Sequence, residues 1–408
     1  MSSKLQMTPM TPTPPKILLL GTGFGQLPMI EACRANGYIC IGVDANPNSV
    51  GADLVDTFYH ADIIDIQAVV GIARKENITA AVTMQSDAPV PAMGAVNDAL
   101  QLTGVSYASA MRCCNKDQTR QTLHVLDITQ PEFSIATNLE SARIAASMIG
   151  YPCIIKAPDS SGSRGVSKVH NLEQVDAAFK HAQDHSRSQQ IIVETYIDGI
   201  EIGAQTFSQD GECIYCFLHN DVLSAGKYMV PIGHSYPFEH ANIDVDVVNT
   251  HISAALKALG ITDGPANVDL IVTAKGDVHI IEIGARIGAT CLPELTSIYT
   301  GVDWVKLTLD NALGRKHVPT VIKQQACAAY IITAPCDGQL KQVIYPEVDS
   351  PKLQHPPVME VTAQLGESVQ RLRKGTDRIG RVVVQADDVT TANEVALHLC
   401  RSVQLEVS

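Results

Sequence analysis

Short apolar runs alternate with helical patterns along the first hundred residues of the chain. Residues 16–20 and 39–43 are apolar runs, and the helical pattern between them continues until Gly37. A third apolar run, residues 80–84, precedes an alanine-rich helical segment. Apolar runs of this length separated by helices are typical of parallel strands, so the pattern predicts an open parallel sheet over residues 16 to about 108.

The middle of the chain mixes helical and strand patterns. Residues 115–150 are predicted to be helical, with a break at Gln130-Pro131. Segments 200–207 and 213–217 alternate like an antiparallel pair, and residues 247–259 again have a helical pattern. Between these segments, the pattern predicts strands at residues 153–156, 166–169 and 190–194 and a helix at residues 172–184.

The last eighty residues have a pattern of their own. Strand-like runs at residues 328–333, 358–362 and 380–385 precede a helical pattern at 391–402 and a final short strand. This order predicts a separate small α+β lobe over residues 326–408. We find no cluster of chemically reactive residues in its sequence.

Two strand-like runs between residues 266 and 286 each carry an acidic residue, and a turn signal at Lys275-Gly276 separates them. A hairpin centred on that dipeptide pairs positions whose numbers have a constant sum, which places Asp269 opposite Glu282. Facing side chains on one face of an antiparallel pair lie ~5 Å apart, and like charges there are destabilising unless a cation lies between them. The hairpin therefore predicts a divalent-cation site.

Oxygen ligands in small number suit Mg2+, which keeps water ligands and shares its shell with substrate phosphates. The alternative is an exposed hairpin with two solvated acids. Apolar neighbours favour the metal site, because they predict strands covered on both sides, where a carboxylate needs a partner. These neighbours are Val268, Leu270, Ile281 and Ile283 on one face, and Ile271, Val278 and Ile280 on the other.

Composition excludes several classes of function. The net charge of -13 opposes binding to nucleic acid or to anionic membranes. No apolar run approaches the roughly 18 residues of a membrane span. Residues 1–15 lack the apolar centre of a signal peptide, so we expect them to be a disordered tail and the protein to be cytoplasmic. Eleven cysteines without a CxxC pair or zinc spacing indicate reduced thiols.

A glycine-rich turn follows the first apolar run. The sequence Gly21-Thr22-Gly23-Phe24-Gly25 departs from the dinucleotide motif GxGxxG, although Asp44 lies about twenty residues on, where a ribose-binding acid is expected. Nicotinamide or flavin binding is one interpretation, and a tight strand–helix turn that needs glycine is the other. In either case the turn lies where ligands collect in parallel sheets, at the carboxyl ends of the strands.

A lysine and a polar loop form a second candidate site. Lys156 ends an apolar strand, and residues 158–165 form a loop rich in glycine and serine. Backbone N–H groups and hydroxyls in such a loop can cradle phosphate, although the P-loop motif is absent and an ordinary mobile hairpin tip is the alternative. A lysine at the end of a buried strand needs an anionic partner, which favours phosphate.

The chain carries its charged and polar candidates in a fixed order, namely Lys116, Lys156, the loop Ser160–Gly165, Glu194, Glu201, Asp269, Glu282 and Arg286. With this ordered set the chain resembles the ATP-grasp ligases, and its C-terminal part resembles the L-amino acid ligase branch. The resemblance spans residues 16–408. It implies an α/β ATP-grasp fold with α+β lobes.

The resemblance implies three domains in this chain. They are a Rossmann-like domain over residues 16–112, an ATP-grasp domain over residues 113–325 with a lid lobe at about 135–196, and a C-terminal α+β lobe over residues 326–408.

The resemblance implies the cofactors ATP and Mg2+, with Mn2+ as the alternative metal. Lys116 and Lys156 would contact phosphates, Glu194 the adenine amino group, and Glu201 the ribose hydroxyls. The implied ATP site contains Lys116, Lys156, Ser160, Ser161, Gly162, Ser163, Gly165, Val166, Glu194, Thr195, Tyr196, Ile197 and Glu201. Asp269 and Glu282 would bind the metal, and Arg286, Lys156 and Ser163 would be catalytic.

Two departures from the family pattern affect these expectations. Many relatives have Asn-Pro where this chain has Gly284-Ala285, so an asparagine ligand to the metal is lost. The branch often continues Gly-Gly-Asp, but Gly288-Ala289-Thr290 stands here, which alters the expected contacts to the amine substrate.

The implied reaction joins a carboxylate to an amine through an acyl phosphate, releasing ADP and phosphate. The substrates would be a small-molecule carboxylate and amine, and the resemblance implies a homodimer. The predicted substrate site contains Gly23, Gln85, Asp87, Lys227, His234, Tyr236, Arg286 and Gly288. For His234 a structural role is the alternative. Rival functions are carboxylation or amidation of a sugar or nucleotide precursor, a nicotinamide-dependent oxidoreductase, and a non-catalytic nucleotide-binding regulator.

Overall fold

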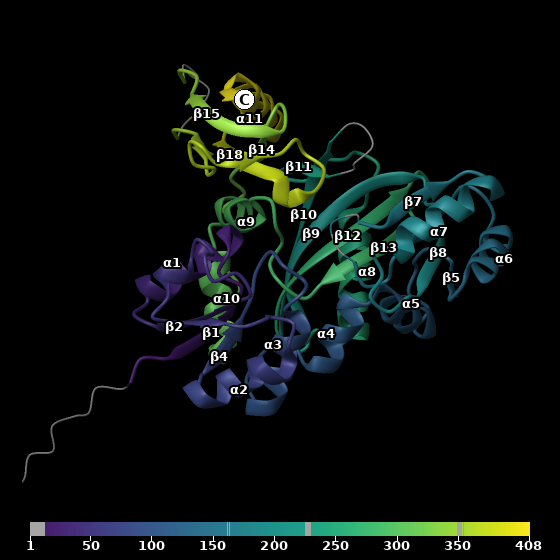
Figure 1. Ribbon diagram of the computed structural model, residues 1–408, viewed down its shortest axis with the longest axis horizontal. Helices are drawn as coiled ribbons and strands as arrows, with labels where there is room; N and C mark the ends of the chain where they lie inside the picture. Colours follow the sequence, from purple (N-terminus) through teal and green to yellow (C-terminus); the bar gives the residue numbers. More distant parts are fainter. Residues whose placement is uncertain are drawn as a thin grey trace, which may run out of the picture.

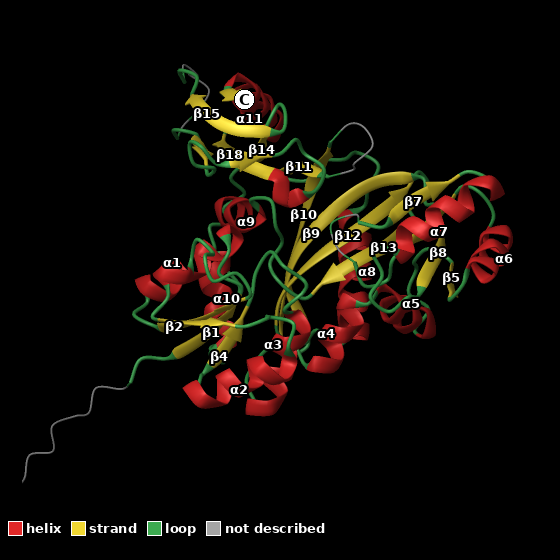
Figure 2. Cartoon of the chain, viewed as in Figure 1, coloured by secondary structure: helices red, strands yellow, loops and turns green. Residues whose placement is uncertain are grey.

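The computed structural model describes residues 13–160, 162, 164–224, 230–320, 322–348, 353 and 355–408. Most of the predicted N-terminal tail, residues 1–12, lies outside this part. Four β-sheets and the helices that cover them make up the described chain (Figures 1 and 2). Among the described helices, none is both long and apolar enough to cross a bilayer.

The N-terminal domain is built on a four-stranded sheet in the order β3-β2-β1-β4, and each neighbouring pair is parallel. Residues 17–20 of β1 are buried, with alternate side chains in two different hydrophobic clusters, so both faces of the sheet are covered. This confirms the predicted parallel sheet. Its elements are β1 (Lys16–Leu20), α1 (Leu27–Ala35), β2 (Ile39–Asp44), β3 (Thr57–His60), α2 (Ile66–Glu76), β4 (Ala80–Val82), α3 (Val90–Leu100) and α4 (Tyr107–Cys114).

A long, curved sheet of eight strands forms the centre of the molecule, in the order β13-β12-β9-β10-β11-β14-β18-β16 (Figure 1). Helix α8 (Val245–Leu259) packs its apolar side chains, such as Ile252, against the same cluster as Val268 and Leu270 of the sheet. The strands are β9 (Gly199–Gln209), β10 (Glu212–Leu223), β11 (Pro231–Tyr236), β12 (Gly264–Thr273), β13 (Val278–Gly284), β14 (Cys327–Thr333), β16 (Val358–Val361) and β18 (Arg378–Gln385).

The hairpin β12–β13 pairs Asp269 with Glu282, as predicted. The turn alone would not give this pairing, because the strands leave it with Val272 opposite Val278, a register that would place Ile281 opposite Asp269. The register then shifts by one position, because Leu270 pairs with Ile280 and Ile281 is left as a bulge. The predicted assignment of faces is wrong beyond the bulge: Ile280 shares the buried face of Leu270, and Ile281 is only half-buried. One face of the hairpin is thus buried against the core, and the other carries the two acids.

A smaller lid sheet, in the order β5-β8-β6-β7, lies at the far end of the molecule (Figure 2). Strand β5 was predicted to be part of a helix. Gln130-Pro131 precedes the strand and Asn138 caps the next helix, so the 115–150 segment divides into helix, strand and helix. The elements here are α5 (Lys116–Val125), β5 (Phe133–Ala136), α6 (Leu139–Ile149), β6 (Cys153–Lys156), β7 (Val166–Val169), α7 (Val175–Gln183) and β8 (Ile191–Thr195).

The C-terminal lobe continues the central sheet, because β14 pairs with β11. A separate core forms where α11 packs on this part of the sheet. The pattern of the sequence did not predict β11 or β15, whose side chains alternate only weakly between apolar and polar. The remaining elements are α9 (Leu292–Thr300), α10 (Trp304–Ala312), β15 (Gly338–Ile344), β17 (Ser368–Val369), α11 (Val389–Ser402) and β19 (Gln404–Val407).

Candidate nucleotide and metal site

The two opposed acids create a local excess of negative charge. Burial, reinforced by the neighbouring Glu282 and Asp221 carboxylates, raises the pKa of Asp269 to about 8. Asn267 donates a hydrogen bond from Nδ2 to Asp269 Oδ1 at 3.0 Å, and Lys116 Nζ lies 2.9 Å from Glu282 Oε1. An ionised Asp269 still requires more positive charge than one lysine supplies. The pair therefore fits a divalent cation.

A buried ionic cluster connects the lid to the central sheet. Glu194 accepts hydrogen bonds from Arg120 Nε and from Lys156 Nζ, both at 2.7 Å, and all three side chains are at most 5 % exposed. Burial alone would raise the pKa of Glu194, but Arg120 and Lys156 lower it to about 2. Burial lowers the pKa of Lys156 to about 8, partly offset by Glu194. Two cations and one anion leave a net positive charge.

Arg120 also reaches the acidic hairpin. Its Nη1 and Nη2 atoms donate to the carbonyl oxygens of Ile280 and Ile281, at 3.2 and 2.9 Å. These carbonyls belong to the bulge, so the bulge presents two adjacent acceptors to one guanidinium. Each Glu194 oxygen accepts from one cation and keeps a further lone pair, so the contact of this carboxylate with adenine stays a prediction.

The polar loop lies beside Lys116. Lys116 Nζ donates to the Ser160 carbonyl at 2.7 Å, and its backbone N–H donates to the Pro158 carbonyl at 2.9 Å. Gly165 has a φ of +71°, and a Cβ there would lie 2.8 Å from the Cβ of His185, so this position requires glycine. The predicted site residues Ser161 and Ser163 lie outside the described residues.

Arg286 is held side-on by a carboxylate from the N-terminal domain. Its Nη2 donates to Asp87 Oδ2 at 2.9 Å, and its Nε lies 2.8 Å from Asp87 Oδ1. The backbone N–H of Gln85 donates to the Ile287 carbonyl at 3.1 Å, which joins the same two segments. Asp87, Arg286 and the acidic hairpin thus meet where the N-terminal domain contacts the central sheet.

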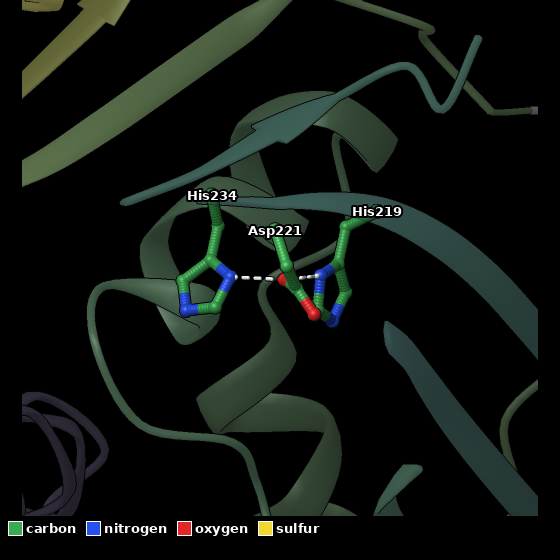
Figure 3. A group of neighbouring side chains, drawn as sticks. All are labelled: His219, Asp221 and His234. Atoms are coloured by element: carbon green, nitrogen blue, oxygen red, sulfur yellow. Dashed lines mark hydrogen bonds and ion pairs between the residues drawn. The ribbon is translucent and has the colours of Figure 1, made fainter. Parts of the chain in front are cut away.

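Two histidines share one carboxylate on the same face of the sheet (Figure 3). Asp221 Oδ1 lies 2.8 Å from His219 Nδ1 and 2.5 Å from His234 Nδ1. Burial lowers the pKa of His219 and outweighs the attraction of Asp221. Although burial would raise the pKa of Asp221, the two histidines lower it well below the usual range. The Nδ1 contacts leave each Nε2 turned away from the carboxylate, and the three residues could also hold a metal ion.

Gly203 of β9 lies between His219 and Asp269 in the sheet, since it pairs with both. A Cβ at Gly203 would lie 2.1 Å from His219 Cε1 and 2.5 Å from Nε2, so the imidazole fills the space above this glycine. The buried Nε2 of His219 has no hydrogen-bond partner within the described chain. The ring therefore leans from β10 across β9, in the direction of the acidic hairpin.

Other predicted substrate residues have different surroundings. Tyr236 is fully buried; it stacks on Tyr299, and its hydroxyl is 3.2 Å from Thr296 Oγ1. The prediction that Tyr236 lines a pocket is therefore wrong, because Thr296 and Tyr299 of α9 cover this end of β11. Lys227 lies outside the described residues.

Two of the predicted glycines lie in tight surroundings. A Cβ at Gly288 would lie 2.6 Å from Asn267 Oδ1, and one at Gly23 would lie 3.3 Å from Gln26 Oε1.

The segment after β8, which contains the predicted adenine and ribose contacts, is only partly buried. Thr195 has a buried hydroxyl without a described partner, Tyr196 lies beneath the Lys168 ammonium, and Ile197 is half-buried. Glu201 is exposed as a residue, but its carboxyl group is partly shielded from water. This shielding and the nearby Asp221 carboxylate raise the pKa of Glu201. Val166 is 37 % exposed at the start of β7.

Asp44 has a structural role. Its Oδ2 accepts from the backbone N–H of Thr22 at 2.8 Å, and Oδ1 accepts from the backbone N–H of Asn46 at 2.8 Å. The carboxylate thus fixes the glycine turn instead of projecting from it. This supports the interpretation of that turn as a tight strand–helix connection.

The sequence pattern did not identify three residues of this site, namely Arg120, His219 and Asp221. Arg120 is four residues after Lys116 on α5, a spacing that places both on one helix face and could have indicated a shared role. His219 and Asp221 alternate on β10, which directs both to one face of the sheet. His234 joins them only through the pairing of β10 with β11.

Comparison with known proteins agrees with this architecture. A model of the ATP-grasp domain matches residues 149–294. The chain is 26% identical over 319 residues to the carbamoyl phosphate synthase large chain of Thermoanaerobacter sp. (strain X514). This match covers 74% of the chain but only 29% of that relative, so the chain spans less than a third of its length.

Several solved structures have the same fold over nearly the whole chain. Phosphoribosylglycinamide synthetase from Anaerococcus prevotii matches with a TM-score of 0.79 and 22% identity, covering 97% of this chain and 100% of that one. L-amino acid ligase from Bacillus licheniformis matches with a TM-score of 0.78 and 17% identity, covering 98% and 100%.

The biotin carboxylase domain dimer of the Hydrogenobacter thermophilus 2-oxoglutarate carboxylase, in complex with MgADP, matches with a TM-score of 0.77 and 16% identity, covering 96% and 90%. The chain therefore has the ATP-grasp fold, and its residues 149–294 match the ATP-grasp domain.

Proposed function

We propose that the protein is an ATP-dependent carboxylate–amine ligase that forms an acyl phosphate and releases ADP and phosphate. A small carboxylate attacks the γ-phosphate of ATP, and an amine then attacks the acyl carbon and displaces phosphate. Phosphoryl transfer requires mainly positioning and charge neutralisation, which the charged residues of this site can supply without a covalent nucleophile.

One observation carries this proposal: the half-buried, opposed Asp269 and Glu282 lie beside a buried cluster with net positive charge. A site that concentrates negative charge next to positive charge fits a cation bound to an anionic ligand. A metal–nucleotide complex has this charge pattern.

The cations have separate tasks in the proposed ATP site. Lys156 and Arg120 together exceed the charge of Glu194, so a phosphate completes their neutralisation. Lys116 contacts the loop at Ser160 and approaches the same phosphates. The loop excludes water from the acyl phosphate, which would otherwise hydrolyse. The hinge backbone at Thr195–Ile197 would bind adenine, and Glu201 the ribose.

Asp269 and Glu282 would hold Mg2+, or Mn2+ as the alternative, which when bound neutralises phosphate charge. Gly284 stands where many relatives supply an asparagine ligand, so water or a bidentate Glu282 must complete the shell. Arg286, held by Asp87, would stabilise the oxyanion that develops when the amine attacks. The substrates would be small molecules, and the resemblance favours a homodimer.

A second candidate is carboxylation or amidation of a sugar or nucleotide precursor. Its support is the fold shared with phosphoribosylglycinamide synthetase over the whole chain. The two candidates use the same nucleotide site and differ in the substrate that accepts the phosphoryl group. A non-catalytic nucleotide-binding regulator would bind the nucleotide without turnover.

The test is a screen for ADP and phosphate release with carboxylates and amines, singly and in pairs, followed by the mass of the product. We expect ADP only in the presence of a carboxylate, and Glu282→Ala should lower its formation by more than a hundredfold by removing one side of the metal site. AMP and pyrophosphate as products would refute the mechanism. Mg-ATP binding without turnover on any substrate pair would favour the regulator.

A further inference from the structure

A cavity of about 110 Å³ lies between the N-terminal domain and the C-terminal lobe. About 10–15 Å³ of such volume is enough for one water molecule, so the cavity has room for a small organic molecule. Its walls come from the start of α1, the segment after β4, the first turn of α9 and strand β18. The residues that matter for the argument are Phe24, Leu27, Gln85, Glu294, Arg378 and Arg381.

The two arginines of the cavity differ in their partners. Arg381 is neutralised by two carboxylates, Glu294 through Nη1 and Glu360 through Nε. Arg378 donates from Nη2 to the neutral side-chain oxygen of Gln85 at 3.0 Å, and no carboxylate pairs with it in the part of the chain that the structure describes. A guanidinium has five N–H donors, and a carboxylate can accept two of them side by side. Arg378 therefore offers a site for an anion.

An acceptor in the same cavity has no donor. One oxygen of Glu294 pairs with Arg381, while the other, Oε2, is buried and lacks a hydrogen-bond partner among the described residues. A buried acceptor without a donor is unfavourable, so a ligand that supplies a donor is favoured there. Besides Glu294 and Glu360, the exposed Glu31 adds a third carboxylate at the wall. Glu294 and Glu31 suit an ammonium group.

The cavity thus combines a site for a carboxylate, a site for an ammonium group and an apolar wall of Phe24 and Leu27. An α-amino acid has all three parts. We propose that this cavity binds the amine-donating substrate of the ligase, an α-amino acid whose carboxylate contacts Arg378 and whose amino group faces Glu294. The assignment of a substrate role rests on the proposed ligase function.

Two arguments place this amino acid as the amine donor. The ion pair with Arg378 makes this carboxylate a weaker nucleophile toward ATP, which favours phosphorylation of the other substrate. Gln85 connects the cavity to the proposed reaction site, because its backbone contacts Ile287, the residue after Arg286, and its side chain contacts Arg378.

The backbone around Gln85 is arranged to hold this side chain in place. Gln85 has a φ of +59°, which is uncommon for a residue with a side chain. A Cβ at Gly25 would lie 3.1 Å from Gln85 Oε1, so the glycine turn leaves the room that this amide occupies. The turn thereby positions the partner of Arg378.

The experiment measures binding of each standard L-amino acid to the full chain by titration calorimetry, followed by steady-state kinetics. For each amino acid that binds, the matching primary amine without the carboxylate is tested in parallel. We expect Arg378→Gln to weaken amino acid binding and raise its KM roughly 10–100-fold, with the KM for ATP unchanged. Arg378→Lys should restore part of the loss.

The comparison with the decarboxylated amine separates recognition from folding. The wild-type protein should bind the amino acid more tightly than the matching amine. Arg378→Gln should weaken binding of the amino acid much more than binding of the amine, so the two affinities should become similar. Glu294→Gln should weaken both ligands, because each has the ammonium group. Arg401→Gln, a matched change at an exposed position of α11, should leave all values as in wild type.

Unchanged amino acid binding in Arg378→Gln would overturn the inference, as would binding of phosphorylated sugars in place of amino acids. Hydroxylamine, offered as a nucleophile without a carboxylate, distinguishes the two proposals. If wild type and Arg378→Gln form hydroxamate and ADP at equal rates while amino acids bind elsewhere, only the cavity assignment fails. If neither forms ADP but amino acids still bind through Arg378, the ligase function fails.

Discussion

At the scale of single residues, the site is a set of charges that compensate one another only in part. Glu194 is neutralised by two cations, and Asp269 is opposed by another acid. Both imbalances persist because burial makes water a poor substitute for a partner. Burial and these unequal charges together displace the pKa values of Glu194, Lys156 and Asp269.

Lys156 should make nucleotide affinity depend on pH. Burial lowers its pKa to about 8, so above that pH its ammonium group loses a proton and attracts phosphate less. We expect ADP affinity to fall by up to about tenfold per pH unit above 8. Lys156→Arg keeps its charge, so the difference between the two proteins, measured by calorimetry from pH 7 to 9.5, isolates Lys156. Parallel pH profiles would contradict this prediction.

Glu194 should contribute to stability through its two ion pairs. Glu194→Gln leaves Arg120 and Lys156 buried without an anion, which should lower the free energy of unfolding by about 3–5 kcal/mol at pH 7. Its folded pKa of about 2 lies below the unfolded value of 4.5, so the stabilisation is present above 4.5 and is lost as pH falls through 2. In urea denaturation, the difference in the free energy of unfolding between the wild-type protein and Glu194→Gln should therefore become smaller below pH 4.5.

At the scale of elements, the central sheet holds the polar groups in register. Three of its strands carry Asp269, Gly203 and His219 in one row, since Gly203 pairs with both of the others. The bulge at Ile281 turns two carbonyls toward Arg120, and it shifts the register so that Glu282 lies opposite Asp269. The hairpin thus combines a regular segment that opposes the acids with an irregular one that binds the lid cluster.

Gly203→Ala should disturb this row. The new methyl group would collide with the His219 ring, and overpacking of this kind costs about 1–3 kcal/mol. His219→Ala in the same protein should recover most of that loss, which a double-mutant cycle of unfolding free energies would measure. Gly71→Ala is the control, because a Cβ there meets nothing within 4 Å on helix α2 and should be neutral or stabilising. Additive effects of Gly203→Ala and His219→Ala would refute the contact.

At the scale of the whole molecule, the site is assembled from parts far apart in the chain. The N-terminal domain supplies Asp87, the lid supplies Lys156 and Glu194, and the central sheet supplies Glu282 and Arg286. A ligand that contacts all of these parts should stabilise the folded state as a unit.

Mg-ADP should therefore raise the melting temperature of the protein. At a concentration of about 100 times its Kd, a ligand specific for the folded state adds about 2.7 kcal/mol. We expect EDTA to reduce the shift in wild type, and Glu282→Ala to lose the part that depends on Mg2+ while it keeps the part due to ADP alone. Differential scanning calorimetry measures both parts, and a shift indifferent to EDTA would count against the metal site.

The sequence by itself determined the elements whose patterns are local. The apolar runs of the N-terminal sheet and the turn near Lys275-Gly276 follow from periodicity and turn chemistry, which neighbouring residues specify. The opposition of Asp269 and Glu282 also needs the bulge at Ile281, which the turn does not specify. Weakly patterned strands such as β5 and β11 were missed, because partners distant in the chain stabilise them.

The tertiary structure alone decided which charges meet. Arg120 is an ordinary helix residue in the sequence, and only the tertiary structure brings it to Glu194 on β8 and to the Ile280 carbonyl on β13. Tyr236 was predicted to line the substrate pocket, but its side chain is fully buried in the core. Arg378 and Glu294 come from segments far apart in the chain, and their shared cavity exists only where the C-terminal lobe meets the N-terminal domain. The physical reason is that side-chain contacts depend on the packing of whole elements, which local periodicity does not specify.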